Sequence, residues 1–164
     1  MRYPKSLLVL VFLGIFGAIA CLKDNVCKPI SAEEEEKRMQ AFLNTDSIQR
    51  FVAQNDLTVQ HDTRGFYYIV LAEGNSQRPS VSNTVKVEYK GYLTDFRTFD
   101  QSREPVHFSL SGLIAGWQMG LPKIGKGGRI MLILPPSLAY GCTKMNIIEE
   151  NSVLVFDLTL HDFL

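Results

Sequence analysis

The sequence predicts an α+β domain in which an antiparallel β-sheet wraps around one short α-helix. From Gly65 onward, apolar and polar residues alternate with a period of two, which is typical of strands with one buried face. One helical stretch, residues 113–121, interrupts the strands, and Pro122 ends it because proline lacks a backbone N–H. The strands otherwise follow one another without the βαβ rhythm of a parallel sheet, so an antiparallel arrangement is expected.

Residues 1–20 have the features of an export signal. Arg2 and Lys5 provide positive charge, residues 7–19 are mostly apolar, and Ala18-Ile19-Ala20 places small residues before Cys21. The apolar run is shorter than the roughly 20 residues that a transmembrane helix needs. Two interpretations remain open. The site resembles a bacterial lipobox, in which the cysteine takes a diacylglycerol group, or the segment is an ordinary cleaved signal or an uncleaved anchor.

Residues 21–31 are expected to be a lipid-anchored tether, with lipidation at Cys21. Residue 22 is leucine rather than the aspartate that favours retention in the inner membrane of Gram-negative bacteria. We therefore expect a cell-envelope protein that is held by lipid in the outer membrane and faces the periplasm.

Residues 32–64 are expected to be a helical lead-in to the domain. Ser31 and Glu34 match a capping box, which predicts a helix over residues 32–43. The acids at positions 33–36 suit the positive end of that helix, and they are interpreted as a solvated face, with an interaction role as the alternative. A second helix should follow, with an apolar stripe that packs on the domain. This stripe consists of Ile48, Phe51 and Val52.

The strands of the main domain, residues 65–164, follow from short alternating or apolar runs. In residues 84–93 the apolar side chains of Val85, Val87 and Tyr89 share a face, opposite charged neighbours. Residues 152–161 alternate in the same way around Phe156. The expected strands are residues 66–71, 84–93, 106–110, 128–134 and 152–161.

The charges and motifs of the chain exclude several classes of function. Lys+Arg and Asp+Glu number 17 each, and the cations are scattered singly, which argues against a nucleic-acid partner. The glycine-rich residues 125–128 precede a strand rather than a helix, so they predict a tight turn and not a phosphate loop. The three histidines lack metal-ligand spacing, and no metal site is expected. Cys27 and Cys142 are interpreted as free thiols, with a disulfide as the alternative.

Six motifs in the second half of the chain occur in a specific order and spacing. They are VKVEYKGYL (85–93), FDQSR (99–103), LIAGW (113–117), GKGG (125–128), PPSLAYG (135–141) and LVFDL (154–158). On these motifs, residues 84–164 resemble the FK506-binding protein (FKBP) type of peptidyl-prolyl cis–trans isomerase. The resemblance implies a strongly curved antiparallel sheet around one helix. Together with the N-terminal features, it is similar to exported lipoprotein members of that family in Gram-negative bacteria.

The resemblance also implies a pocket for a proline ring. Trp117 would form its floor, and the backbone N–H of Ile114 would bind a substrate carbonyl. Asp100 and Tyr140 would be the catalytic polar groups, with the Tyr140 hydroxyl donating to a substrate carbonyl. The remaining substrate-binding residues would be Tyr89, Phe99, Ile114 and Phe156 in the walls, and Ile147 and Ile148 in a flap-like loop.

The implied chemistry is rotation about an Xaa-Pro bond, whose barrier is about 18–20 kcal/mol. No covalent bond breaks, so neither cofactor, metal nor nucleophile is expected. The implied partners are proline-containing polypeptides and an FK506-like ligand. Val106 stands where many members have an aromatic residue, and Glu149-Glu150 replaces a common Pro-Pro pair. These differences motivate an alternative, a peptide-binding module or chaperone of the same fold with little isomerase activity.

Overall fold

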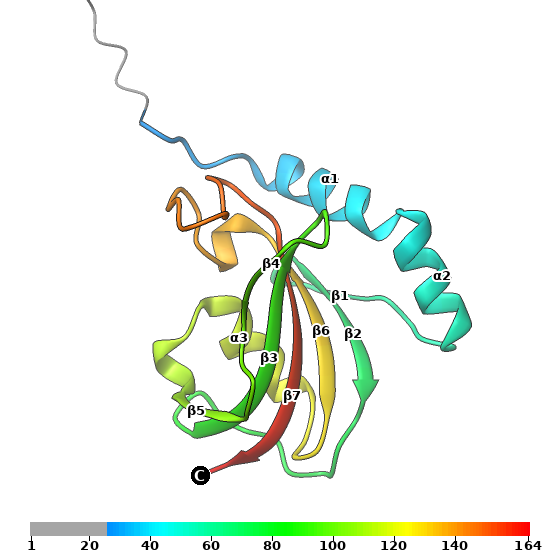
Figure 1. Cartoon of the computed structure of the whole chain (residues 1–164), viewed down its shortest axis with the longest axis vertical. Coiled ribbons are helices and arrows are strands. Elements are labelled where there is room, and N and C mark those ends of the chain that lie inside the picture. Colours follow the sequence, from blue (N-terminus) through cyan, green and yellow to red (C-terminus); the bar gives the residue numbers. More distant parts are fainter. Residues whose placement is uncertain (1–25) are drawn as a thin grey trace, which may run out of the picture.

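The computed structural model describes residues 26–164 (Figure 1). The predicted signal peptide, the lipidation site Cys21 and the tether as far as residue 25 lie outside these residues. Within the described part of the chain, none of the helices has the length and apolar character needed to cross a membrane.

Seven strands of the described chain form one antiparallel sheet. They are β1 (Gln60–Asp62), β2 (Phe66–Ala72), β3 (Thr84–Leu93), β4 (Thr98–Gln101), β5 (Val106–Ser109), β6 (Arg129–Leu134) and β7 (Leu154–Phe163). Their order is β1-β2-β6-β7-β3-β4, and β5 also pairs with β3. The long strands β3 and β7 curve together through the middle of the sheet (Figure 1). The predicted antiparallel α+β class is confirmed.

Three α-helices accompany the sheet in the described residues. They are α1 (Ala32–Leu43), α2 (Asp46–Gln54) and α3 (Ala115–Gly120). Short 3₁₀ turns cover Leu110–Gly112, Leu121–Lys123 and Pro136–Leu138. Helix α3 is shorter than the predicted stretch of 113–121, because Leu113 and Ile114 have extended backbone and the chain tightens into a 3₁₀ turn at Leu121.

The helices lie on opposite faces of the sheet, with α3 on one side and α1 and α2 on the other (Figure 1). Strand β6 shows why both faces are apolar. Ile130 and Leu132 belong to the core around α3, whereas Met131 and Ile133 belong to the core under α1 and α2. Successive side chains of a strand point to opposite faces, so a central strand covered on both sides becomes a continuous apolar run.

Helix α1 begins as predicted. The Glu34 backbone N–H donates to the Ser31 hydroxyl oxygen at 3.2 Å, which is the first half of a capping box. The Glu34 carboxylate instead accepts from Arg38, at 2.9 Å. The interpretation of the acids as a solvated face is wrong for Glu35, which is buried against the domain. Periodicity did not distinguish Glu35 from its exposed neighbours, because its hydrogen-bonding partner, Ser137, lies 102 residues away.

The apolar stripe of α2 packs on the domain, as expected, and apolar residues of α1 join the same contact. Met39 and Phe42 from α1 and Ile48 from α2 are buried against Tyr67, Ile69 and neighbouring residues of the sheet. Phe51 and Val52 complete this contact at the edge. The lead-in therefore forms one hydrophobic unit with the outer face of the sheet.

Strands β1 and β4 were not predicted. Each is short, at three and four residues, and polar or exposed along most of its length, so neither shows a period of two. Their strand conformation depends on pairing with β2 and β3 respectively. Because β1 pairs with β2, the sheet begins at Gln60, before the alternation becomes visible at residue 65.

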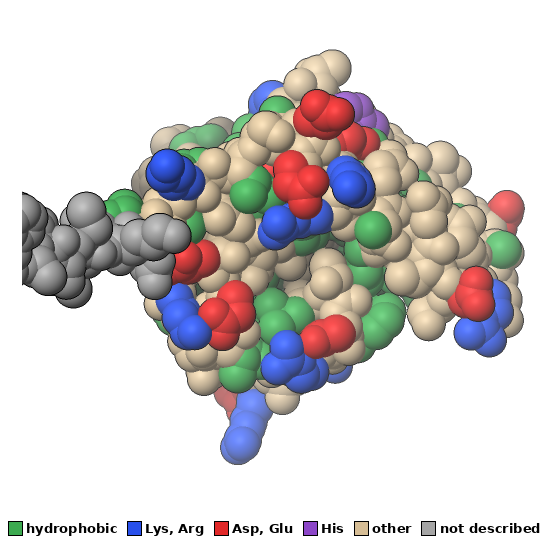
Figure 2. All heavy atoms as spheres, turned by 90° about the horizontal axis from the view of Figure 1, so that it is seen from above, with side chains coloured by type: hydrophobic (Ala, Val, Ile, Leu, Met, Phe, Trp, Pro, Cys, Tyr) green, Lys and Arg blue, Asp and Glu red, His purple; other side chains and the backbone are tan. Residues whose placement is uncertain are grey.

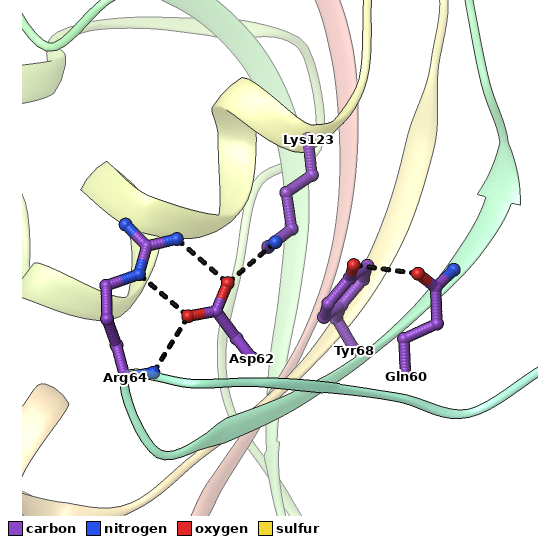
Figure 3. A network of polar contacts seen from close by, with 5 residues as sticks. All are labelled: Gln60, Asp62, Arg64, Tyr68 and Lys123. Carbon is purple, nitrogen blue, oxygen red and sulfur yellow. Dashed lines mark hydrogen bonds and ion pairs between the residues drawn. The ribbon is translucent and has the colours of Figure 1, made fainter.

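A polar network fastens the β1–β2 hairpin to the turn that follows α3 (Figure 3). Asp62 accepts two side-chain hydrogen bonds from Arg64, at 2.7 and 2.9 Å, and lies 2.7 Å from the Lys123 ammonium. The same ammonium lies 4.2 Å from the centre of the Tyr68 ring. Tyr68 donates its hydroxyl hydrogen to Gln60 at 2.7 Å. The network thus links the edge of the sheet to the chain segment that carries α3.

Cys27 and Cys142 form a disulfide, with their Cα atoms 5.6 Å apart. The prediction that both are free thiols is therefore wrong. The two cysteines are separated by 115 residues, and sequence spacing carries no information on a pairing that only the packing of the N-terminal segment creates.

Candidate functional site

The candidate site is a cavity of about 160 Å³ between α3 and the concave face of the sheet. Its floor is Trp117, the single tryptophan of the chain, of which only 5% is exposed. The lining residues come from β3, β4, β5, β7, α3 and the segments next to α3 and the last 3₁₀ turn. They are Tyr89, Phe99, Asp100, Phe108, Leu113, Ile114, Trp117, Tyr140 and Phe156.

Three rings meet Trp117 edge-on. Their centres lie 5.4 Å away for Tyr89, 5.3 Å for Phe156 and 6.3 Å for Phe108, with interplanar angles between 71° and 88°. Phe99 in turn packs at 84° on Phe156, with 5.5 Å between the ring centres. Edge-to-face pairs of this kind are favourable, and here they hold a rigid apolar wall around the indole.

Gly91 allows two of these rings to approach the backbone of β3. A Cβ atom at this position would lie 2.5 Å from the Phe99 ring and 3.0 Å from the Phe156 ring. Both distances are shorter than ordinary van der Waals contact. A glycine is therefore required here by the wall of the cavity rather than by the backbone conformation.

Asp100 and Tyr89 form the polar edge of the cavity. The Tyr89 hydroxyl donates to Asp100 Oδ2 at 2.8 Å. Burial raises the pKa of Tyr89 to about 12, and the hydrogen bond to Asp100 adds to this shift. Because Tyr89 stays protonated at physiological pH, it remains the donor in this bond and orients the carboxylate of Asp100 at the rim.

Tyr140 follows the 3₁₀ turn Pro136–Leu138, and it lines the same cavity. Burial raises the pKa of Tyr140, and the negative charge of Asp100 raises it further. A neutral phenol can donate a hydrogen bond, so Tyr140 is available to a carbonyl group of a bound molecule.

The structure brings together seven of the nine site residues predicted from the sequence. It places Ile147 and Ile148 outside this cavity, in a tight turn closed by two backbone hydrogen bonds between Met145 and Ile148, at 2.8 and 3.0 Å. Phe108 and Leu113 were missed. Phe108 belongs to an alternating run and Leu113 to a matched motif, but neither signal distinguishes a cavity wall from ordinary core.

A larger cavity, of about 550 Å³, lies elsewhere, between α1, the β3–β4 turn and residues 147–153. Charged side chains line much of it, among them Arg38, Asp95 and Glu150. Figure 2 looks down on this end of the molecule, where acidic and basic side chains are mixed with apolar ones around a hollow. The smaller aromatic cavity is the better candidate site, because a small apolar group is bound by concave apolar walls with a few polar groups.

Among residues 26–164, no group of three His, Cys, Asp or Glu side chains is placed to hold a metal ion. The polar side chains of the site are one carboxylate and two phenols, which can accept and donate hydrogen bonds to a bound molecule.

Comparison with known proteins agrees with this fold and site. Residues 75–161, more than half of the chain, match the family of FKBP-type peptidyl-prolyl cis-trans isomerases. The chain is 46% identical over 107 residues to the FKBP-type isomerase FkpA of Escherichia coli K12, covering 63% of this chain and 40% of the relative. The FkpA of Aeromonas hydrophila is 33% identical over 132 residues, covering 79% of this chain and 47% of that protein.

Solved structures show the same similarity. The crystal structure of E. coli FkpA superimposes with a TM-score of 0.66 at 37% identity, covering 80% of this chain and 58% of the other. A peptidyl-prolyl isomerase from Pseudomonas syringae superimposes with a TM-score of 0.64 at 26% identity, covering 84% and 98%. The chain therefore belongs to the FKBP-type peptidyl-prolyl cis-trans isomerase family. It spans less than half the length of the two FkpA sequences that it matches.

Proposed function

We propose that this chain accelerates the cis–trans isomerisation of Xaa-Pro bonds in polypeptides. The observation that carries this proposal is the aromatic cavity over Trp117, closed by Asp100 and Tyr140. Its size and apolar walls suit a proline ring, and Asp100 and Tyr140 supply polar groups that could bind the flanking peptide backbone.

The chemistry requires only binding and orientation. In the planar ground state the amide carbonyl is polarised by resonance with nitrogen, and this resonance is lost as the bond twists. A dry apolar cavity disfavours the polar planar form more than the twisted form, which lowers the barrier. Tyr140 and the backbone N–H of Ile114 would hold the flanking carbonyls, and Asp100 would orient the substrate at the rim.

The direct test is the exchange rate between cis and trans forms of an Xaa-Pro peptide, measured by NMR with the purified chain. We expect acceleration that FK506 suppresses. Asp100→Ala and Tyr140→Phe should each lower kcat/KM by about tenfold, equivalent to roughly 1.4 kcal/mol of transition-state stabilisation. Trp117→Ala should also weaken peptide binding. Peptide binding without acceleration would instead favour the peptide-binding module of the same fold.

We also propose that the protein is exported and held in the outer membrane by lipid at Cys21. The N-terminal signal pattern supports export, and the disulfide between Cys27 and Cys142 suits an oxidising compartment such as the periplasm. Labelled palmitate should enter the wild-type protein and not a Cys21→Ser variant. Equal labelling of both proteins would contradict lipidation at this residue, and membrane fractionation would test the outer-membrane location.

A further inference from the structure

Helix α1 holds the loop that carries Tyr140. Glu35 on α1 is only 9% exposed, and its carboxylate faces Ser137. One oxygen accepts the Ser137 backbone N–H at 2.9 Å, and the other accepts the Ser137 hydroxyl hydrogen at 2.8 Å. Two hydrogen bonds from one residue to a charged acceptor fix both the position and the orientation of that residue.

The chain around Ser137 and Tyr140 forms a tight hydrogen-bonded turn. The backbone N–H groups of Ala139 and Gly141 both donate to the carbonyl of Pro136, at 3.0 and 2.9 Å. Tyr140 is the third residue after the anchor, Ser137, and the hydrogen-bonded turn between them has little freedom. The position of Ser137 thus determines where the Tyr140 side chain enters the cavity.

The same N-terminal segment also holds the chain beyond Tyr140. The disulfide joins Cys27 to Cys142, two residues after Tyr140. Asn151, where this loop returns, accepts a hydrogen bond from Arg38 at 3.1 Å and donates one to the carbonyl of Lys28 at 3.0 Å. The loop is thus fixed at both ends by residues that precede the family match at residue 75.

We propose that Glu35 is a positioning residue for the isomerase site. By holding Ser137, it sets the place of the Tyr140 hydroxyl relative to the substrate carbonyl. This inference rests on the proposed function of Tyr140, and it extends the functional unit from the matched domain to helix α1. A small displacement of an orienting group is sufficient to slow a reaction, since a shift of about 1 Å can cost up to about a hundredfold in rate.

The test compares three variants of the full chain, purified in detergent. Glu35→Ala removes both hydrogen bonds and should lower kcat/KM by about three- to tenfold, within the range that misplaced groups produce. Glu35→Gln should retain most of the rate, because its amide can accept from the Ser137 N–H and donate to the Ser137 hydroxyl. The matched control is Glu36→Ala on the same helix. It removes hydrogen bonds from Tyr67 of β2 and Gln40 of α1, but it leaves the bonds between Glu35 and Ser137 in place.

A double variant separates positioning from general stability. If Glu35 acts through Tyr140, then Glu35→Ala should have little further effect on kcat/KM in a Tyr140→Phe background. A loss of the same size in both backgrounds would overturn the proposal. So would a loss of activity in Glu36→Ala equal to that in Glu35→Ala.

Amide hydrogen exchange gives a second measurement that does not depend on activity. Glu35→Ala should speed exchange in residues 137–142, whereas Glu36→Ala should not, because the anchor to Ser137 is intact. Unchanged exchange in this segment would overturn the proposal. If the wild-type chain shows no isomerase activity, the proposed function fails, and the exchange comparison still decides whether Glu35 holds the loop.

Discussion

At the scale of single residues, the cavity depends on a position that carries no side chain. Gly91→Ala would place a methyl group 2.5 Å from the Phe99 ring and 3.0 Å from the Phe156 ring. We expect Phe99 to be pushed into the cavity, with a loss of about 1–3 kcal/mol in the free energy of unfolding from overpacking. The measurements are denaturant unfolding and kcat/KM.

The control for this substitution is Lys90→Ala on the same strand, because Lys90 is exposed. It should leave the free energy of unfolding and kcat/KM close to those of the wild type. If Gly91→Ala behaved like Lys90→Ala in both measurements, the rings would not be held against the backbone as described.

Asp62 provides a prediction of pH dependence. Hydrogen bonds from Arg64 hold the pKa of its carboxyl well below the usual range, with a further contribution from Lys123 and against the opposing effect of burial. The stabilisation is therefore complete above the unfolded-state pKa of about 3.9 and declines as the pH falls below it toward the lower folded-state pKa.

The measurement for Asp62 is the free energy of unfolding of wild type and Asp62→Asn between pH 7 and pH 2.5. The variant should be less stable at neutral pH by about 1–3 kcal/mol, the usual cost of losing hydrogen bonds to a charged group. The difference should narrow on acidification below about pH 4, where the unfolded chain takes up its proton. A difference that stayed constant over this range would refute the assignment of the stabilisation to the carboxylate.

Sequence patterns located most of the lining residues, but not their interactions. Trp117, Asp100 and Tyr140 stood in recognisable motifs. The hydrogen bond from Tyr89 to Asp100 joins residues 11 apart on two strands, so it depends on the register of β3 and β4. Glu35 was interpreted as solvated because it belongs to an acidic run. Its hydrogen-bonding partner, Ser137, is distant in sequence, so no local pattern indicated the contact.

At the scale of elements, α3 approaches β6 closely because two glycines face the sheet. A Cβ atom at Gly116 would lie 2.3 Å from the Leu134 side chain, and one at Gly120 would lie 2.5 Å from Leu132. These glycines are four residues apart and so share one face of the helix. The close approach brings Trp117, between them in sequence, against the sheet.

We expect Gly120→Ala to destabilise the protein despite the better helix propensity of alanine. Forcing a methyl group into the packed contact with Leu132 should cost about 1–3 kcal/mol, more than the roughly 1 kcal/mol that alanine adds to a helix. The measurement is the free energy of unfolding in urea. Gly112→Ala is the matched control, because a Cβ atom there meets nothing within 4 Å.

A gain in stability for Gly120→Ala would show that α3 can move away from β6 at little cost. The contact between helix and sheet would then be looser than these distances indicate.

Long or strongly patterned elements could be predicted from the sequence, and short ones could not. The bounds of β3 and α1 agree with expectation because ten or twelve residues carry a clear period and, for α1, a cap. Strands β1 and β4 are too short and too polar to show a period of apolar residues. They form because β2 and β3, respectively, offer backbone hydrogen-bonding groups for pairing.

At the scale of the whole molecule, the disulfide between Cys27 and Cys142 joins the segment before α1 to the part of the chain that matches the FKBP family. Reduction should lower the free energy of unfolding by about 2–4 kcal/mol, because the unfolded chain regains the freedom of a long loop. Unfolding in denaturant with and without a reducing agent measures this effect.

The control is the double variant Cys27→Ser/Cys142→Ser, which should resemble the reduced wild type and should not respond to the reducing agent. If reduction left the wild type unchanged, the N-terminal segment would be held by its other contacts alone.

The antiparallel α+β class, the two lead-in helices and seven residues of the aromatic cavity could be predicted before the structure was known. The class and the helices follow from local periodicity and a cap, which are properties of neighbouring residues, whereas the seven cavity residues follow from the resemblance of six ordered motifs to a known family. Three features became visible only in the folded molecule: the disulfide between Cys27 and Cys142, the hydrogen bonds from Ser137 to Glu35, and the contribution of Phe108 and Leu113 to the cavity. Each of these facts depends on two segments meeting in space, and the free energy that brings them together comes from burying both faces of the sheet.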